Sequence, residues 1–288
     1  MTRKQLVEQI FLKHSYLCVG LDTDVDKIPL HLQSHPDAVF EFNQAIIDAT
    51  KEYCVSYKIN TAFYEAMGAK GWEIMQRTVD YIPETHFKIA DAKRGDIGNT
   101  SAQYAKAFFE TLNFDAITVA PYMGSDSLKP FLEHQNKTTI VLGLTSNAGA
   151  KDFELQKMLI ETHILDEGVH ITKKDSPFLY EWVIDKVREW GTIENLMFVI
   201  GATRLEELKS IRNKIPDHFL LIPGVGAQGG DLNEISTHLL NKDAGILVNS
   251  SRSIIYASGG EDFAEKAKLA AKDYQGQMQS FLSETANT

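Results

Sequence analysis

The chain has 288 residues, of which 43% are apolar and 24% charged, a balance typical of a globular protein. Its 29 basic and 39 acidic residues give a formal net charge of −10, which argues against a protein that binds nucleic acid or an anionic membrane. No run approaches the roughly 18 apolar residues that span a bilayer, and the N-terminus lacks the apolar core of an export signal, so we expect a cytoplasmic protein. That location favours buried free thiols over a disulfide for Cys18 and Cys54.

Short runs rich in Val, Ile, Leu and Ala alternate with amphipathic stretches along the whole chain. Eight runs are nearly continuous in apolar residues, as expected of parallel strands buried on both faces. They are Leu17–Leu21, Val55–Ile59, Phe87–Ala90, Ala116–Ala120, Thr139–Leu144, Leu196–Ile200, Phe219–Ile222 and Gly245–Val248. Helical spacing predicts helices over Arg3–Lys13, Val39–Thr50, Glu65–Tyr81, Thr100–Asn113, Ser125–His134, Leu179–Trp190, Thr203–Asn213, Leu232–Leu240 and Glu261–Phe281.

Eight strand–helix repeats predict a closed (β/α)8 barrel, the TIM barrel of the α/β class, with an additional N-terminal helix. No linker, repeat or low-complexity tract divides the chain, so residues 1–288 are expected to form a single domain. One gap between strands is unusually long. We interpret Ser146–Ser176 as an insertion in the loop after the fifth strand.

In such a barrel the active site lies at the C-terminal ends of the strands. The stretch Asp91-Ala-Lys93-Arg-Gly-Asp96 follows the third strand, and Lys58 stands in the second. Asp91 and Lys93, two residues apart on a strand, should point to the same face, and Lys58 can pair with Asp91. Such a cluster is often only a surface salt-bridge network, but a lysine in a buried strand needs a partner or a task.

Three chemistries use a lysine in this setting. A Schiff-base lysine needs a lowered pKa, which flanking carboxylates oppose. A divalent-metal site would set the fixed charge of the lysine against the cation. The third option fits best: a protonated lysine donates a proton to carbon as a leaving group departs, and carboxylates repel that anionic group. This chemistry needs no cofactor and no metal ion.

The loops after the last two strands predict a phosphate site. Pro223-Gly-Val-Gly-Ala-Gln-Gly-Gly lets backbone N–H groups approach an anion, and Gln228 adds an amide donor. Such a loop alone could be a tight turn. The neighbouring Asn249-Ser-Ser-Arg252, whose guanidinium can hold two phosphate oxygens, favours a phosphate monoester.

Two further motifs fail. Residues 224–229 match the G-x-G-x-x-G dinucleotide fingerprint, but only one strand follows, too few for half of a Rossmann fold. Asp22-Thr-Asp24-Val-Asp26 opens like a calcium loop, but Lys27 stands where glycine is required and Gln33 where the closing glutamate belongs.

The stretch Asp91-Ala-Lys-Arg-Gly-Asp-Ile-Gly-Asn-Thr100 resembles the signature of the orotidine 5′-phosphate decarboxylase family. The resemblance extends in order from about residue 14 to residue 258. Within the family, the sequence is similar to the longer bacterial (type 2) subgroup. Its other blocks are Val19-Gly-Leu-Asp22, Lys58, Ala120-Pro-Tyr-Met-Gly124, Gly143-Leu-Thr-Ser-Asn147, the segment Pro223–Gly230, and Ser250-Ser-Arg252.

The resemblance implies removal of CO2 from orotidine 5′-monophosphate to give UMP, the last step of UMP synthesis, without metal or cofactor. It implies that Lys93 protonates C6 of the pyrimidine and that Asp91 lies against the substrate carboxylate. Lys58 would complete the charge network and touch the ribose. Asp96 and Thr100 would reach into the partner's site of a homodimer.

The remaining implied roles concern substrate binding. Asp22 would bind a ribose hydroxyl, Ser146 the pyrimidine amide edge, and Ile97 and Pro223 would wall the pocket that receives CO2. Gln228 and Arg252 would hold the phosphate, with Gly224 and Ser251 in the same two loops also among the substrate-binding residues. Two alternatives stay open: a related barrel lyase that acts on a keto-sugar phosphate with Mg2+, and a non-catalytic sensor of a phosphate ligand.

Overall fold

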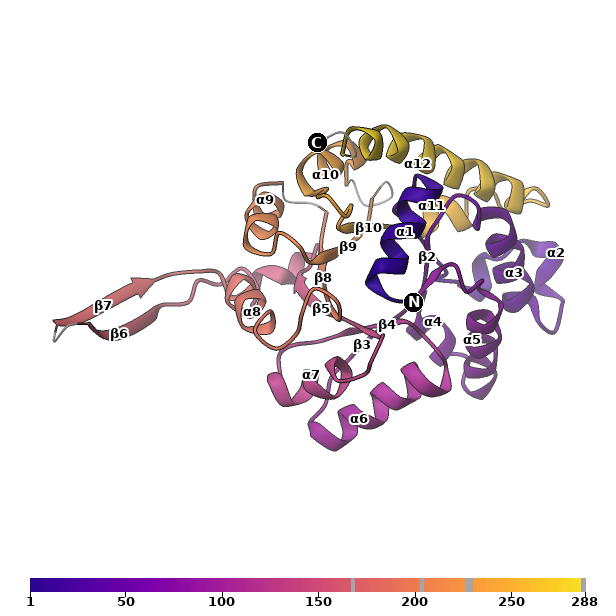
Figure 1. The fold of residues 1–288 in the computed structure, drawn as a ribbon. Helices are drawn as coiled ribbons and strands as arrows, with labels where there is room; N and C mark the ends of the chain where they lie inside the picture. The colour runs from indigo at the N-terminus through magenta and orange to yellow at the C-terminus, as the bar shows by residue number, and fades with distance from the viewer. Residues whose placement is uncertain (167–168, 203–204, 226–229, 286–288) are drawn as a thin grey trace.

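Eight parallel strands close into a barrel in a computed structural model that describes residues 1–166, 169–202, 205–225 and 230–285. The barrel strands are β1 (Leu17–Gly20), β2 (Ser56–Asn60), β3 (Phe87–Arg94), β4 (Ala116–Val119), β5 (Thr138–Leu144), β8 (Leu196–Ile200), β9 (Phe219–Pro223) and β10 (Ile246–Ser250). They are hydrogen-bonded in the order β1-β10-β9-β8-β5-β4-β3-β2, which confirms the predicted TIM barrel (Figure 1).

The strands are buried almost throughout, because their inner side chains fill the barrel and their outer ones pack under the helices. Every residue of β1, β4, β8 and β10 is buried. β1 closes the barrel by pairing with β10, where Leu17 lies opposite Val248, and with β2, where Gly20 lies opposite Lys58. This closure brings the C-terminal ends of the first and last strands side by side.

In the described part of the chain the nine predicted helices appear in order, together with three short helices that were not predicted, and one predicted helix has a clear error. They are α1 (Arg3–Lys13), α2 (Leu30–Gln33), α3 (Ala38–Thr50), α4 (Thr61–Glu65), α5 (Ala69–Tyr81), α6 (Gly98–Lys106), α7 (Ser125–Leu132), α8 (Leu179–Val187), α9 (Leu205–Lys214), α10 (Leu232–Leu239), α11 (Arg252–Ile255) and α12 (Phe263–Thr285). The prediction of one helix over Glu65–Tyr81 is wrong at its start. Helix α4 ends with Ala66 as its C-cap, and Gly68, with a φ of 65°, is the N-cap of α5.

The additional N-terminal helix α1 lies across the end of the barrel opposite the strand C-termini (Figure 1). The ammonium of Met1 pairs with Asp115, which precedes β4, and Arg3 Nη2 lies 2.8 Å from Asp243 Oδ2, which precedes β10. These contacts hold α1 on the face that serves stability in this fold.

The insertion after β5 contains a 3-10 turn (Ala148–Lys151) and an antiparallel hairpin of β6 (Ile160–Asp166) and β7 (Val169–Asp175). The hairpin extends well away from the barrel (Figure 1). Its register sets Ile160 opposite Asp175.

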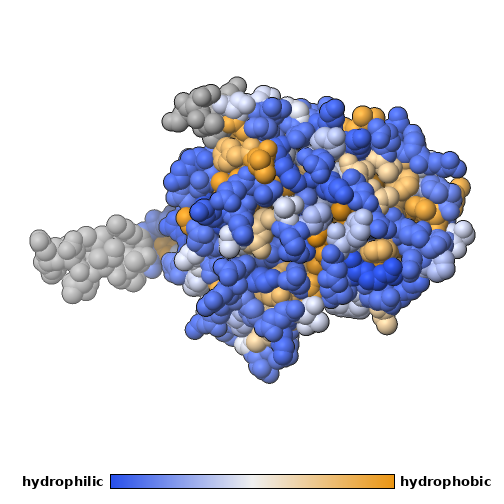
Figure 2. All heavy atoms as spheres, turned by 45° about the vertical axis from the view of Figure 1, so that its right-hand side comes forward, coloured by the Kyte–Doolittle hydropathy of each residue, from blue (hydrophilic) through white to orange (hydrophobic). Residues whose placement is uncertain are grey.

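The polar composition of the chain is visible on the surface. The face in Figure 2 is mainly hydrophilic, with apolar residues in separate patches. Within the described parts of the chain, no helix is both long and apolar enough to cross a bilayer.

Candidate active site

A cavity of about 210 Å3 opens at the C-terminal end of the barrel. The ends of β1, β2, β3, β9 and β10, which are neighbours around the barrel, supply its walls. It is lined by Asp22, Lys58, Asn60, Asp91, Pro223, Gly224, Val225, Asn249, Ser251 and Arg252. The structure thus brings predicted charge-network residues and predicted phosphate-loop residues into one cavity.

A chain of alternating charges crosses the floor of this cavity. Lys58, whose side chain is 5% exposed, places its Nζ 3.0 Å from Asp22 Oδ1 and 3.1 Å from Asp91 Oδ2. Lys93 Nζ lies 2.6 Å from Asp91 Oδ1. Thr118 of β4 donates its hydroxyl to the same oxygen at 3.0 Å, so Asp91 accepts from three side chains.

Asp91 and Lys58 are both held in their charged forms by their neighbours. Burial acts to raise the pKa of Asp91, but the ammonium groups of Lys58 and Lys93 outweigh it and hold that pKa well below its usual range. Burial likewise acts to lower the pKa of Lys58, and the carboxylates of Asp22 and Asp91 outweigh it and raise that pKa. At neutral pH the site therefore presents a fixed carboxylate between two lysines.

Lys93 reaches Asp91 by a route that strand alternation does not predict. Its φ is 48°, in the left-handed region, and the pairing of β3 with β4 shifts register between Ala90 and Arg94. The Lys93 N–H donates to Thr118 Oγ1 at 2.9 Å, which holds this conformation. A non-glycine residue in such a region costs about 1–3 kcal/mol, a strain typical of functional sites. The side chain is half exposed, at the open side of the site.

The described residues that are predicted to bind phosphate lie beside one another, where the neighbouring strands β9, β10 and β1 end. Gly224 has a φ of 86°, and Arg252 is an exposed residue at the start of α11. Ser251 lies directly over Gly20, where a Cβ would come within 1.8 Å of Ser251 Oγ. Gln228 lies outside the described residues.

Sequence reasoning assigned no role to two asparagines in this cavity. Asn60 accepts a hydrogen bond from the Ala62 N–H at 3.2 Å and caps α4. Asn249 Oδ1 is buried and, within the described structure, has no hydrogen-bond partner. A buried amide oxygen without a partner in a cavity wall marks a place where a ligand can donate. Neither asparagine carries a charge that would have drawn attention in an apolar strand.

Five predicted site residues in the described part of the chain do not line the cavity: Lys93, which contacts Asp91, and Asp96, Ile97, Thr100 and Ser146. The Asp96 carboxylate accepts from the Ile97 N–H at 2.7 Å, and in the described contacts of a single chain it does not join the Lys58–Asp91–Lys93 array. Ile97 is 60% exposed, and Thr100 is exposed. Ser146 follows β5, which is separated from β9 by β8 around the mouth of the barrel.

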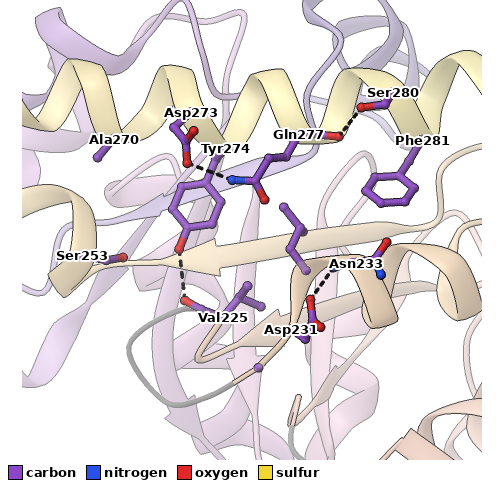
Figure 3. Close-up of a pocket in the computed structure, with 12 residues that line it drawn as sticks. Val225, Asp231, Asn233, Ser253, Ala270, Asp273, Tyr274, Gln277, Ser280 and Phe281 are labelled. Carbon is purple, nitrogen blue, oxygen red and sulfur yellow. Dashed lines mark hydrogen bonds between the residues drawn. The ribbon is translucent and has the colours of Figure 1, made fainter.

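A larger cavity of about 660 Å3 lies between α10 and α12, beside the residues predicted to bind phosphate. Figure 3 shows Tyr274 reaching from α12 toward Val225, whose carbonyl accepts from the Tyr274 hydroxyl at 3.4 Å. Ser250 donates to the same hydroxyl at 3.2 Å. Tyr274 therefore links the end of β10 to Val225, a residue that lines both cavities.

The chain is similar to known proteins over nearly its full length. A family model described as "Orotidine 5'-phosphate decarboxylase / HUMPS family" matches residues 15–267. The orotidine 5′-phosphate decarboxylase of Christiangramia forsetii is 54% identical over 285 residues, covering 98% of this chain and 99% of its own. That of Flavobacterium johnsoniae is 53% identical, covering 98% of each chain.

Solved structures agree. The Leishmania donovani OMP decarboxylase aligns with a TM-score of 0.76 and 31% identity over 98% of each chain. The Plasmodium berghei orotidine 5′-monophosphate decarboxylase aligns with a TM-score of 0.78 and 25% identity over 98% of this chain and 99% of its own. The family model and the full-length relatives together show that the chain belongs to the orotidine 5′-phosphate decarboxylase / HUMPS family.

Proposed function

We propose that this protein decarboxylates orotidine 5′-monophosphate to UMP and CO2, the last step of UMP biosynthesis. The observation that carries the proposal is the Asp91 carboxylate held between Lys58 and Lys93 at the mouth of the barrel. Relatives of full length that share about half of its residues bear the name of this activity.

The charge array suits a reaction in which an anion leaves as a neutral molecule. The substrate carboxylate lies against ionised Asp91, an arrangement that favours its departure as CO2. The bond between C6 and the carboxyl carbon breaks, its electron pair stays on C6, and Lys93 Nζ gives C6 a proton. Lys93 is half exposed and regains that proton from water.

Residues of the cavity wall, and others that follow the C-terminal ends of the strands, would bind the rest of the substrate. Asp22 and Lys58 bind the ribose hydroxyls, and Ser146 the amide edge of the pyrimidine. Pro223 and Ile97 wall the space that receives CO2. The phosphate is held by the two loops that carry Gly224, Gln228, Ser251 and Arg252.

The array also bears on the main alternative, a lyase that acts on a keto-sugar phosphate with Mg2+. Such a site needs carboxylates free to bind the cation, and the Lys58 ammonium lies between Asp22 and Asp91, within about hydrogen-bond distance of both. No group of three potential ligand side chains gathers at one point in the described part of the chain.

The decisive assay is loss of ultraviolet absorbance of orotidine 5′-monophosphate by metal-stripped protein. We expect turnover that is unchanged by a chelator. Loss of turnover on adding the chelator would count against the proposal. So would a protein that leaves orotidine 5′-monophosphate unchanged but converts a keto-sugar phosphate when Mg2+ is added.

We further propose a homodimer in which Asp96 and Thr100 complete the partner's site. The support is that Asp96 stays outside its own charge array, beside loops that expose apolar side chains: Ile97 is 60%, Tyr122 91% and Met123 47% exposed. An inactive Asp96→Ala chain mixed with an inactive Lys93→Ala chain should then regain about a quarter of wild-type activity, because half the dimers carry one intact site. No regained activity after demonstrated subunit exchange would exclude shared sites.

Two further predictions remain proposals: a single domain over residues 1–288, and a cytoplasmic location. One continuous core under all eight barrel strands supports the first, and a single calorimetric unfolding transition would test it. The free, buried thiols of Cys18 and Cys54 support the second, and fractionation of cells tests it. Burial raises the pKa of Cys18 to about 12 and that of Cys54 to about 11, which suits unreactive thiols.

A further inference from the structure

The insertion after β5 folds back onto that strand, and its residue Glu154 forms hydrogen bonds with Thr145, the residue directly after β5. The carboxylate of Glu154 accepts two hydrogen bonds from a single residue, Thr145: the backbone N–H donates to Oε2 at 2.6 Å and the hydroxyl to Oε1 at 2.7 Å. Hydrogen bonds to a charged acceptor are about twice as strong as neutral ones. This fork fixes Thr145 through both its backbone and its side chain.

Backbone hydrogen bonds hold Glu154 and the next residue in place. Its carbonyl accepts from the Tyr180 N–H of α8 at 3.0 Å, and the next residue, Leu155, donates its N–H to Ala150 at 3.0 Å. The Glu154 side chain is half-buried. The carboxylate is therefore presented by a folded segment that is joined to the barrel, rather than by a free loop.

Ser146, the residue after Thr145, has a second fixed neighbour on its other side. Gly201 follows β8 and donates its N–H to the Leu144 carbonyl at 2.7 Å. A Cβ built on Gly201 would lie 2.7 Å from Ser146 N and 2.8 Å from Ser146 Cβ. Ser146 therefore lies between Thr145, which is hydrogen-bonded to Glu154, and the backbone of Gly201, which has no side chain.

Loss of the carboxylate would give Thr145 a different hydrogen-bond partner. The Thr145 hydroxyl also lies 2.6 Å from Asn147 Oδ1, and its one hydrogen can serve only one acceptor at a time. Without Glu154 the hydroxyl turns to Asn147, and the backbone N–H beside Ser146 loses its acceptor.

We propose that Glu154 is a positioning residue that sets Ser146 against the amide edge of the pyrimidine. This inference rests on the proposed function, from which the role of Ser146 comes. It gives the insertion a part in recognition of the base, at the end of the substrate opposite the phosphate.

The test compares two ligands of the same site, UMP and ribose 5-phosphate. We expect Glu154→Ala to raise the Kd of UMP about tenfold and to leave that of ribose 5-phosphate unchanged, because the ribose and phosphate contacts stay in place. The KM for orotidine 5′-monophosphate should rise with the Kd of UMP. Glu154→Gln should have an intermediate effect, because its amide keeps one acceptor and turns a donor toward the other site.

The chain offers a matched control and an independent variant. Glu161 lies in the same insertion but pairs with Lys174, 2.8 Å away on the other hairpin strand, so Glu161→Ala should bind both ligands as the wild type does. Gly201→Ala should reproduce the effect of Glu154→Ala by displacing Ser146 from the other side.

Three results would overturn the inference. They are unchanged UMP binding by both Glu154 variants, equal loss of UMP and ribose 5-phosphate binding in the folded Glu154→Gln protein, and unchanged UMP binding by Gly201→Ala. The wild-type assay keeps this test separate from the proposed function, since a protein that fails to convert orotidine 5′-monophosphate refutes the function itself. An active wild type with indifferent Glu154 variants refutes only the positioning role.

Discussion

Replacing Lys58 with methionine removes the ammonium between Asp22 and Asp91 while keeping a side chain of similar length. The Asp22 and Asp91 side chains are only 22% and 13% exposed, so they would face each other with little water between them. Removing one partner of a buried ion pair costs about 3–5 kcal/mol. We expect about 3 kcal/mol at pH 7, the lower end, because Asp91 keeps Lys93 at 2.6 Å.

The penalty should depend on pH in a defined direction. The folded-state pKa of Asp91 lies well below its unfolded value, so its contribution to stability is complete above the unfolded value of about 4. That contribution is lost only as pH falls through the folded value. In Lys58→Met the Asp91 carboxyl protonates more readily, because the ammonium of Lys58 no longer lowers its pKa. The penalty should therefore be constant from about pH 8 to 6 and shrink below about pH 5.

Urea unfolding at pH 7 and pH 4.5 measures both quantities, and a neighbouring lysine provides the control. Lys88 is also buried, its side chain 3% exposed, but its partner Glu84, 2.8 Å away, is 86% exposed and stays hydrated when the lysine is removed. Lys88→Met should therefore cost less than about 1 kcal/mol. Equal penalties for the two variants, or a Lys58→Met penalty independent of pH, would refute the reasoning.

Three further changes test the proposed site. Lys93→Ala should lower kcat by about 10^2- to 10^4-fold while calorimetry still detects UMP binding, and turnover close to that of the wild type would exclude Lys93 as the proton donor. Arg252→Ala should weaken UMP binding by about ten- to a hundredfold and leave uridine binding unchanged, whereas equal losses would place Arg252 away from the phosphate. Tyr274→Phe should raise the KM for orotidine 5′-monophosphate about two- to tenfold with little change in kcat, and an unchanged KM would show that the hydroxyl does not order the phosphate end.

The barrel could be predicted because its strands are buried on both faces, so that each strand is a nearly continuous run of apolar residues in the sequence. Helix boundaries were harder. The helical spacing of apolar residues continues across the break at Gly68, because Tyr64 before the break and Ile74 after it are both buried in the core. Only the backbone shows the break, through the positive φ of Gly68 and the close contact of Gly71 with the Tyr64 carbonyl.

The charge array could be anticipated for a related reason: Lys58 and Asp91 are charged residues in or beside apolar strands. The contacts of Thr118, Asn249 and Glu154 could not be anticipated from the sequence. Thr118 and Asn249 are neutral members of strands, and their importance depends on which atoms the closed barrel brings within reach. Glu154 stands nine residues from Thr145 in an insertion, and only the path of the chain brings the two together.

The left-handed backbone at Lys93 sets stability against turnover at a single position. Glycine would relax there, and we expect Lys93→Gly to gain about 1 kcal/mol in resistance to unfolding over Lys93→Ala. Glycine would thus remove the backbone strain together with the amine that we propose as the proton donor. Efforts to make this protein hardier should hold residue 93 constant and look for gains on the opposite end of the barrel, around α1.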